Sequence, residues 1–316
     1  MSTTAKKSHS YVNVSLARRV ELRPAAFRSV ARVAVGVLVL IVASGATVRM
    51  TGSGLGCPPV TVDISGCVKA YGQLGYHADI EFMNRVVSGL TVIVALVLAA
   101  AAWRTTGLGC RARLLATAAF AATFAQAPLG AITVHYHLNP YLVISHLLLA
   151  FVALGLGVLT LLEATRFVEG GDAALPSLAR LGGAVLLLAV VVLVVTGTLS
   201  TASGRFPGSS GTQVVERIWM FHSAVWLHVR AVAAFGIVFL VLAGWAWLQR
   251  ERFPWLLRGC VGLLAILLVQ MGIGEAQYRT YGTVPWWVVV AHVVVAAMLF
   301  AWTVGLVARL WRPVRH

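Results

Sequence analysis

Eight long apolar runs constrain this chain of 316 residues more than any other feature of its sequence. Hydrophobic residues make up 59% of the chain and charged residues 11%, whereas a soluble domain carries about 25% charged residues. Each run holds about 20 residues, the length of helix that crosses a bilayer. We therefore predict an all-α, polytopic membrane protein with eight transmembrane helices, near residues 30–50, 86–103, 115–135, 141–163, 178–199, 219–248, 259–278 and 286–308.

The basic residues are distributed unevenly between the two sides of the predicted membrane. If the N-terminus is cytoplasmic, 18 of the 25 Lys and Arg fall on the cytoplasmic side, six fall on the other side, and Arg230 lies within a span. This excess follows the positive-inside rule and predicts a multi-pass protein of the plasma membrane with both termini in the cytoplasm. The net charge of +15 does not indicate nucleic-acid binding, because no soluble basic patch is interleaved with aromatic residues.

The chain divides into a tail and two halves. Residues 1–29 are polar and basic and read as a disordered cytoplasmic tail whose charges can contact anionic membrane lipid. Residues 30–165 and 181–316 each hold four predicted helices, and a linker with Gly, Pro and acidic residues joins them at 166–180. Because four is an even number, both halves enter the membrane in the same direction and form two pseudo-symmetric four-helix bundles.

Two segments of the halves resemble each other around a histidine. QAPLGAITVHYHLNPYLVISHLLLA, from Gln126, contains His146, and QMGIGEAQYRTYGTVPWWVVVAHVVVAA, from Gln270, contains His292. Each segment opens with Gln-x-x-x-Gly and places its histidine about two turns into an apolar helix. An imidazole is costly inside an apolar span, so we expect both to be functional. We expect the two glutamines to join neighbouring helices by hydrogen bonds, with a hydrogen bond to a polar group of either pocket as the alternative.

The spacing of the repeat pairs each histidine with a second polar residue. Since 270 − 126 = 144, a shift of 144 residues carries Asn84 onto His228. Asn84 and His146 then face each other in the first half, and His228 and His292 in the second, which is how a four-helix bundle holds a haem. A structural histidine that bonds a neighbouring helix is the alternative. His222, six residues before His228, is the alternative ligand on its helix.

Other residues allow more than one interpretation. Glu81 lies one turn before Asn84 on the same helix face, which places a carboxylate suited to proton transfer over the first pocket. A simple ion pair between Glu81 and Arg85 is an equal alternative. Cys57 and Cys67 lie in the first outward loop, an oxidising compartment, and predict a disulfide, with two free thiols as the alternative. His135 and His137 read as surface residues of another outward loop.

The combination resembles the haem A synthase family, over nearly all of the chain from about Arg28 to Arg312. Members have eight helices in two halves, ligand histidines on the even-numbered helices, an outward cysteine pair and a Glu-x-x-His-Arg motif. Here that motif reads Glu81-Phe82-Met83-Asn84-Arg85, with asparagine in place of histidine. The matches on helices 4 and 8 are His146 and His292.

The resemblance implies an oxidoreductase that converts the methyl group at ring position 8 of haem O into the formyl group of haem A, for cytochrome oxidase. It implies haem b between His228 and His292 and the substrate haem O in the N-terminal half, with Glu81 near the reacting edge. Asn84 is a poor iron ligand, so His146 alone would hold that haem.

Several functional questions stay open at this point. The haem O synthase that supplies the substrate is an expected partner, the electron donor is unidentified, and small-residue faces such as 99–102 are compatible with a homo-oligomer. A non-catalytic b-type cytochrome that carries electrons would share the His228 and His292 site. A transporter built from parallel repeats is a third reading, which the polar residues fit less well because they cluster toward the outer helix ends.

Overall fold

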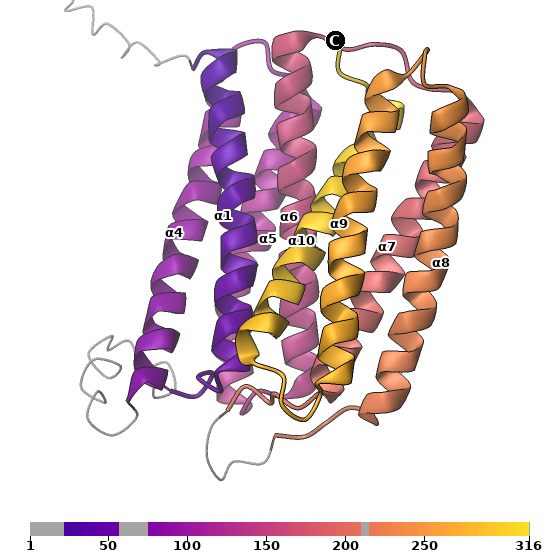
Figure 1. The fold of residues 1–316 in the computed structure, drawn as a ribbon. Coiled ribbons are helices and arrows are strands. Elements are labelled where there is room, and N and C mark those ends of the chain that lie inside the picture. The colour runs from indigo at the N-terminus through magenta and orange to yellow at the C-terminus, as the bar shows by residue number, and fades with distance from the viewer. Residues whose placement is uncertain (1–21, 57–74, 210–214, 316) are drawn as a thin grey trace, which may run out of the picture.

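The computed structural model describes residues 22–56, 75–209 and 215–315 (Figure 1). This described part consists of eight helices, each long and apolar enough to cross a membrane, with no strand beyond isolated bridges. The prediction of an all-α, multi-pass membrane protein is confirmed. The helices are α1 (Pro24–Met50), α4 (Tyr76–Arg104), α5 (Cys110–His135), α6 (Pro140–Glu169), α7 (Ser177–Ser203), α8 (Phe221–Leu248), α9 (Pro254–Arg279) and α10 (Trp286–Trp311).

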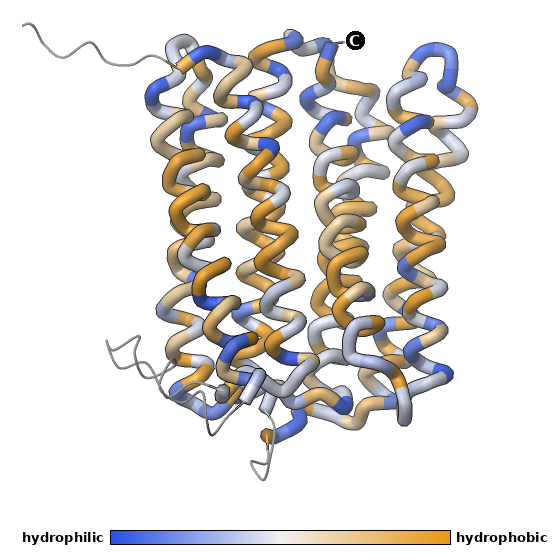
Figure 2. The backbone as a smooth tube through the Cα atoms, turned by 60° about the vertical axis from the view of Figure 1, so that its left-hand side comes forward, coloured by the Kyte–Doolittle hydropathy of each residue, from blue (hydrophilic) through white to orange (hydrophobic). Residues whose placement is uncertain are grey.

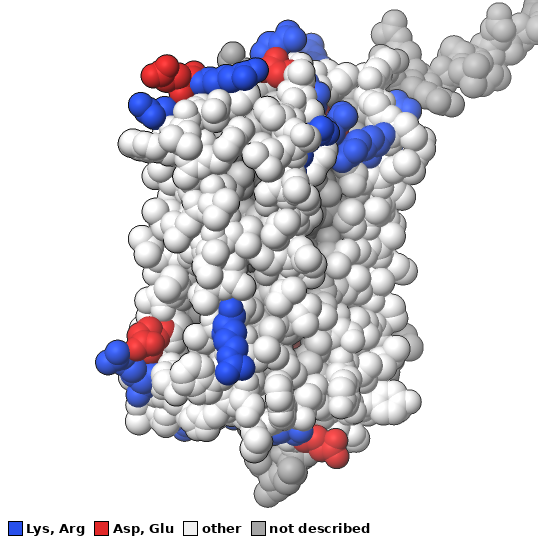
Figure 3. Space-filling view, turned by 90° about the vertical axis from the view of Figure 1, so that its right-hand side faces the viewer, with Lys and Arg blue, Asp and Glu red and all other residues white. Residues whose placement is uncertain are grey.

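The helices stand side by side, so the molecule has two ends. Helix α1 begins and α10 ends at the same end, which we call the terminal end, and the opposite end is the distal end (Figure 1). Apolar residues occupy the middle of the bundle and hydrophilic residues gather toward both ends (Figure 2). One face carries charged side chains near its two ends with a wide uncharged band between them (Figure 3). This pattern matches the polarity of a bilayer.

Several helices extend beyond the apolar runs that predicted them. Helix α1 begins at Pro24, inside the predicted tail, and α4 begins at Tyr76 rather than at residue 86. The linker shortens to residues 170–176, because α6 continues to Glu169 and α7 begins at Ser177. A span predicted from hydropathy ends where polar residues begin, whereas a helix continues through polar residues when their side chains have partners. In the first turns of α4, Glu81 pairs with Arg85.

Each half of the chain forms a ring of four contacting helices. In the first half α1 contacts α4, α4 contacts α5, α5 contacts α6, and α6 contacts α1. In the second half α7, α8, α9 and α10 contact one another in the same cyclic order. The halves meet where α10 contacts α1 and α6 and where α6 contacts α7. Helices α4 and α6, and likewise α8 and α10, therefore stand opposite each other across their rings.

The buried apolar core is larger in the second half than in the first. A cluster from α1, α6, α7, α8, α9 and α10 fills the second ring and the boundary between the halves, where Phe151 and Phe300 pack edge to face at 5.2 Å between ring centroids. A smaller cluster in the first half takes Leu98, Ala101 and Ala102 from α4, all near the terminal end. The distal part of α4 instead buries Glu81.

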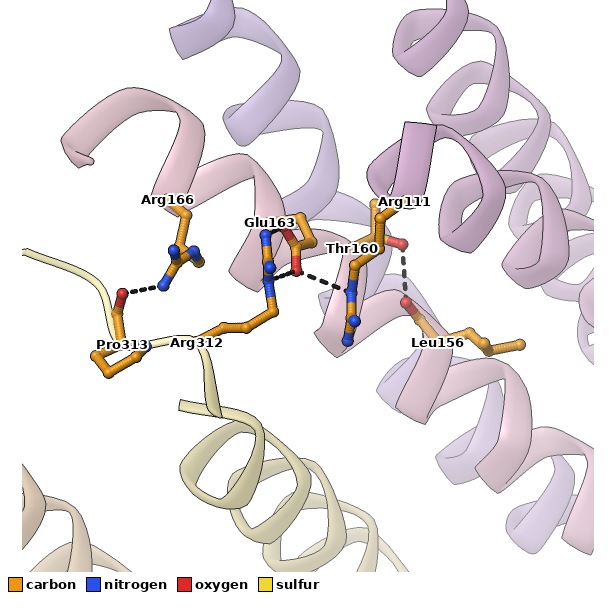
Figure 4. A network of polar contacts seen from close by, with 7 residues as sticks. All are labelled: Arg111, Leu156, Thr160, Glu163, Arg166, Arg312 and Pro313. Atoms are coloured by element: carbon orange, nitrogen blue, oxygen red, sulfur yellow. Dashed lines mark hydrogen bonds and ion pairs between the residues drawn. The ribbon is translucent and has the colours of Figure 1, made fainter. Parts of the chain in front are cut away.

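A buried carboxylate joins the two halves at the terminal end. Glu163, on α6, is 8% exposed and pairs with Arg111 of α5 at 3.1 Å and with Arg312, just after α10, at 2.5 Å (Figure 4). Arg166 binds the carbonyl of Pro313 in the same network (Figure 4). Because a buried charge needs compensation, Glu163 fixes the end of the second half against the first.

The distal end has its own connection between the halves. The amide of Gly54, after α1, donates to the carbonyl of Gly208, after α7, at 2.7 Å. A Cβ atom on Gly54 would lie 2.8 Å from that same oxygen, so only glycine permits this close approach. Arg49 donates to the carbonyl of Thr201 across the same boundary. The two Gly- and Ser-rich segments that follow the first helix of each half therefore contact each other.

We predict that Glu163→Gln destabilises the protein by about 1–3 kcal/mol, because the amide leaves two arginines without their carboxylate partner. Thermal unfolding in detergent measures the change. Glu169→Gln is the matched control, since Glu169 is exposed and forms its ion pair with Arg28 near the surface, where such pairs contribute little. Equal melting temperatures for Glu163→Gln and the wild type would contradict the role of Glu163.

Candidate functional site

His228 of α8 points into the second ring and is held by α7. Its Nδ1 lies 3.1 Å from the hydroxyl of Thr196, which itself bonds the carbonyls of Val192 and Leu193. A carbonyl only accepts, so the single hydroxyl proton is used there and the Nδ1–H of His228 donates to Thr196. The Nε2 atom of His228 then carries a lone pair, the form in which an imidazole binds a metal.

His292 of α10 is held from the other side of the same ring, by α9. The side-chain amide nitrogen of Gln270 lies 3.1 Å from Nε2 of the imidazole, and Nδ1 is buried without a hydrogen-bond partner. An amide NH₂ only donates, so Nε2 of His292 also presents a lone pair. Gln270 therefore follows the alternative interpretation, because it reaches across from α9 to the imidazole itself.

His146 of α6 occupies the corresponding place in the first ring. Gln126 of α5 donates to its backbone carbonyl at 3.2 Å, so this glutamine joins the helices as expected. The Nδ1 atom of His146 is buried and has no hydrogen-bond partner. A buried nitrogen without a partner is costly in a protein that binds nothing at that point, so this atom suggests a missing ligand or water.

A glycine of the neighbouring helix packs against each imidazole. A Cβ atom would lie 3.1 Å from Cε1 of His228 at Gly197, 3.1 Å from Cε1 of His292 at Gly274, and 3.4 Å from Cε1 of His146 at Gly130. The three glycines thus allow the rings to approach the adjoining helices closely. The Gln-x-x-x-Gly pattern of the sequence supplies two of these glycines together with the two glutamines.

Asn84 of α4 stands opposite His146 and is bound by α1. The Ser44 hydroxyl donates to Oδ1 of Asn84 at 2.9 Å, so the amide oxygen is engaged and the NH₂ group is left to donate. Ser44 lies in the first helix of the first half and Thr196 in the first helix of the second, and each binds the polar residue of the next helix. The rings therefore share a layout but differ in chemistry.

Glu81 and Arg85 form the ion pair that their spacing allows. Arg85 Nη2 lies 2.7 Å from Oε1 of Glu81, and the carboxylate side chain is 5% exposed. The pair lies in the distal turns of α4, next to Asn84 along the helix. The ion-pair interpretation is confirmed, while the proton-transfer role of Glu81 stays a prediction.

The other predicted residues lie as follows. His222 is exposed at the start of α8, away from the half-buried His228. His135 and His137 are exposed, as predicted. Cys57 and Cys67 lie outside the described residues. No group of three or more His, Cys, Asp and Glu in the described ranges could hold a bare metal ion, which leaves pairs of side chains from opposite helices as the candidate ligands.

Sequence reasoning missed the distal arginines as a group. Arg49 donates to the carbonyl of Thr201, Arg205 to that of Gly282, and Arg217 to that of Arg205. Burial lowers the pKa of the Arg217 guanidinium from its usual value, and nearby Tyr281 opposes this shift. The sequence did contain a signal for these arginines. The positive-inside rule predicts few basic residues on the non-cytoplasmic side, so the arginines predicted there stand out.

The arrangement resembles a haem site in its donor atoms. Two imidazoles approach the second ring from opposite helices, each with an Nε2 lone pair, as an axially bound haem iron requires. The first ring offers one imidazole, because the amide oxygen of Asn84 is already bonded. The residues of the second ring therefore fit a six-coordinate haem, and those of the first ring fit a haem held on one face.

Residues 74–304 match the sequence profile of the COX15-CtaA family, described as cytochrome oxidase assembly protein. The match covers more than half of the chain and includes Asn84, His146, His228 and His292. The chain belongs to this family. The predicted resemblance is confirmed at this level.

Curated relatives agree with the family over most of their length. A haem A synthase of Listeria monocytogenes serotype 4a (strain HCC23) is 25% identical over 279 residues, covering 84% of this chain and 88% of the relative. A haem A synthase of Geobacillus kaustophilus (strain HTA426) is 26% identical over 273 residues, covering 83% of this chain and 84% of the relative.

We predict that Gly274→Ala displaces the His292 imidazole and destabilises the protein by about 1–3 kcal/mol, because the new methyl group overpacks the ring. Gly272→Ala in the same helix is the matched control, since a Cβ atom there meets nothing within 4 Å. Thermal unfolding compares the two variants. A Gly274→Ala protein as stable as Gly272→Ala would show that the ring does not need this space.

Proposed function

We propose that this protein is a haem A synthase, which oxidises the methyl group at ring position 8 of haem O to the formyl group of haem A. Membership of the cytochrome oxidase assembly family and the relatives named haem A synthase support this activity. The observation that carries the proposal is the difference between the two rings. The second ring has two imidazoles that each carry an Nε2 lone pair, although that of His292 accepts a hydrogen bond from Gln270. The first ring has one imidazole opposite an engaged amide.

The C-terminal half, residues 181–316, would hold haem b between His228 and His292. When bound there, the haem supplies electron transfer. Thr196 fixes the tautomer of His228, which is the role that partners of metal-binding histidines commonly have. Gln270 occupies Nε2 of His292 and would give up this hydrogen bond when the iron binds. His222 is a poorer candidate, because it is exposed at the start of α8.

The N-terminal half, residues 30–165, would hold the substrate haem O through His146. Ser44 engages the oxygen of Asn84, so the face opposite His146 has no iron ligand and stays open to the reaction. Asn84 can still donate its NH₂ group to the bound substrate. Glu81 lies one turn toward the distal end on the same helix face, where its carboxylate can take up a proton that the substrate releases. Arg85 holds Glu81 in place.

The remaining predictions complete the proposed setting. The protein lies in the plasma membrane with its terminal end in the cytoplasm, and a disulfide joins Cys57 and Cys67 on the other side. A haem O synthase supplies the substrate, and an unidentified donor exchanges electrons with the haem b site. A homo-oligomer stays a prediction, but residues 99–102 do not offer its contact, because Ala99, Ala101 and Ala102 are buried inside the bundle.

Haem extracted from cells that express the chain together with a haem O supply tests the activity. We expect haem A in cells with the wild type, and a fall of about 10²–10⁴-fold with Glu81→Gln, because the amide cannot take up a proton. A protein that carries haem b but forms no haem A above background would contradict the synthase proposal. It would instead indicate a b-type cytochrome that only carries electrons.

The ligands of the second ring are tested by absorption spectra of the purified protein. We expect His228→Ala and His292→Ala each to abolish the low-spin signature of an iron with two histidine ligands, because each removes one axial ligand. His222→Ala, which changes an exposed histidine of the same helix, should leave it intact. Loss of the signature in His222→Ala, with retention in His228→Ala, would assign the ligand to His222.

The open face of the first ring is tested by Asn84→His. A histidine at this position restores a second imidazole opposite His146, so we expect haem in the N-terminal half to become six-coordinate and low-spin, and haem A formation to fall. Asn84→Gln, which keeps a carboxamide, is the control and should not add a strong ligand. An unchanged spectrum in Asn84→His would mean that residue 84 does not face the haem.

A further inference from the structure

A chain of hydrogen bonds connects the end of α1 with the start of α4, outside the residues used so far. The hydroxyls of Thr51 and Ser53 lie 2.8 Å apart, and the Ser53 hydroxyl lies 3.0 Å from Nδ1 of His77. The Thr51 hydroxyl also lies 2.8 Å from the carbonyl of Thr47, one turn back in α1. Ser53 is fully buried, so water does not compete for these bonds.

The direction of every bond in this chain follows from the carbonyl at its end. The Thr47 carbonyl only accepts, so the Thr51 hydroxyl donates to it and has no further proton. Ser53 must then donate to Thr51, and His77 must donate its Nδ1–H to Ser53. The imidazole of His77 is therefore held as the tautomer whose Nε2 carries the lone pair. This is how an orienting partner prepares a histidine to act as a base.

Tight packing holds His77 in this position. A Cβ atom on Gly56 would lie 2.6 Å from the His77 carbonyl oxygen, so the segment after α1 lies directly against the first turn of α4. Ser53 forms an isolated bridge with Ser209 of the second half. The ring of Tyr76 lies 4.2 Å from that of His77, centroid to centroid. The imidazole is thus fixed by both halves of the molecule.

His77 and Glu81 are four residues apart in α4, so their side chains lie on the same face, one turn from each other. We propose that His77 relays protons between Glu81 and the distal surface. In each transfer the O–H bond of protonated Glu81 breaks and an N–H bond forms at Nε2 of His77, which leaves a carboxylate and an imidazolium. The imidazolium then releases a proton to water. His77 acts through Glu81 and is a positioning residue for the reaction, so this inference rests on the proposed function.

A cavity of about 540 Å³ lies at the distal end, beside the first turns of α4. Thr51, Tyr76 and Ile80 line it from the first half, and Arg205 and Trp286 line it from the second. The charged and titratable groups near His77 along its own helix are Tyr76, Asp79, Glu81 and Arg85. Arg49 lies two residues before Thr51 at the end of α1, and Arg205 lines the cavity from the second half. Arg85 already pairs with Glu81, so its guanidinium is engaged by that carboxylate.

The tautomer is tested without haem. In protein labelled with ¹⁵N-histidine and reconstituted in lipid, the ring nitrogens of His77, assigned by their loss in His77→Asn, should show a proton on Nδ1 and none on Nε2 at pH 8. Ser53→Ala should abolish this preference, because the acceptor for Nδ1–H is gone. A proton on Nε2 in the wild type, or an unchanged tautomer in Ser53→Ala, would overturn the proposal.

The relay is tested by the pH profile of haem A formation. Wild-type activity should fall toward acid within the pH 5–8 range in which an imidazole becomes charged. His77→Asn keeps an N–H donor for Ser53 but has no base, so its rate should drop about 100-fold and lose this acid limb, and added imidazole should restore part of it. His135→Asn, an exposed histidine at the same end, is the control and should behave as wild type.

The two proposals fail in different ways. If the wild type forms no haem A, the proposed function fails, whatever the tautomer of His77. If the wild type forms haem A and His77→Asn keeps its rate and acid limb, only the relay fails. The haem b spectrum of His77→Asn shows that the variant folds, and Ser53→Ala, which should lower the rate without imidazole rescue, provides the second variant.

Discussion

The interior of this protein depends on hydrogen bonds that adjoining helices make to polar side chains inside apolar rings. An imidazole or carboxamide without a partner is costly there, and an adjoining helix provides a side-chain partner for Asn84, His228 and His292. His146 is the exception, because its Nδ1 atom is buried without a hydrogen-bond partner. Thr196 binds His228, Gln270 binds His292, and Ser44 binds Asn84. These bonds also determine which atom of each side chain remains available to bind a ligand. The same contacts therefore determine both the packing and the chemistry of the rings.

The two rings use one layout for different purposes. In both, the helix that begins the half offers a hydroxyl to the polar residue of the next helix, and the third helix offers glutamine and glycine to the histidine of the fourth. Asn84 in place of a second imidazole changes the outcome in the first ring. In the first ring, the buried apolar cluster takes residues of α4 only near the terminal end. In the distal part of α4, Glu81 is among the buried residues.

The apolar runs predicted all eight helices, because length and hydropathy suffice when a bilayer is the solvent. They missed the start of α4 by ten residues, since Glu81, Asn84 and Arg85 are polar and only their partners explain why the helix continues through them. The internal repeat predicted His146, His228 and His292 within long helices, where the structure has them. It could not show that Gln270 binds a ring while Gln126 binds a backbone carbonyl, because that depends on side-chain geometry.

The role proposed for His77 could not be predicted from the sequence. Nothing in its neighbourhood distinguishes it from the exposed histidines of the other loops, and its partners Thr51 and Ser53 are more than twenty residues away in the chain. Ser53 comes close to His77 because the segment after α1 packs against both halves. Gly54 contacts Gly208 of the second half, and Gly56 contacts the backbone of His77. Such contacts become visible only in the fold.

The central claim is that the two halves hold haem with different coordination. An electron paramagnetic resonance spectrum of the ferric protein, with haem bound in both halves, tests it most directly. We predict one low-spin signal from an iron between His228 and His292 and one high-spin signal from an iron held by His146 alone. Two low-spin signals, or a single haem species in protein loaded to two haems per chain, would contradict the account.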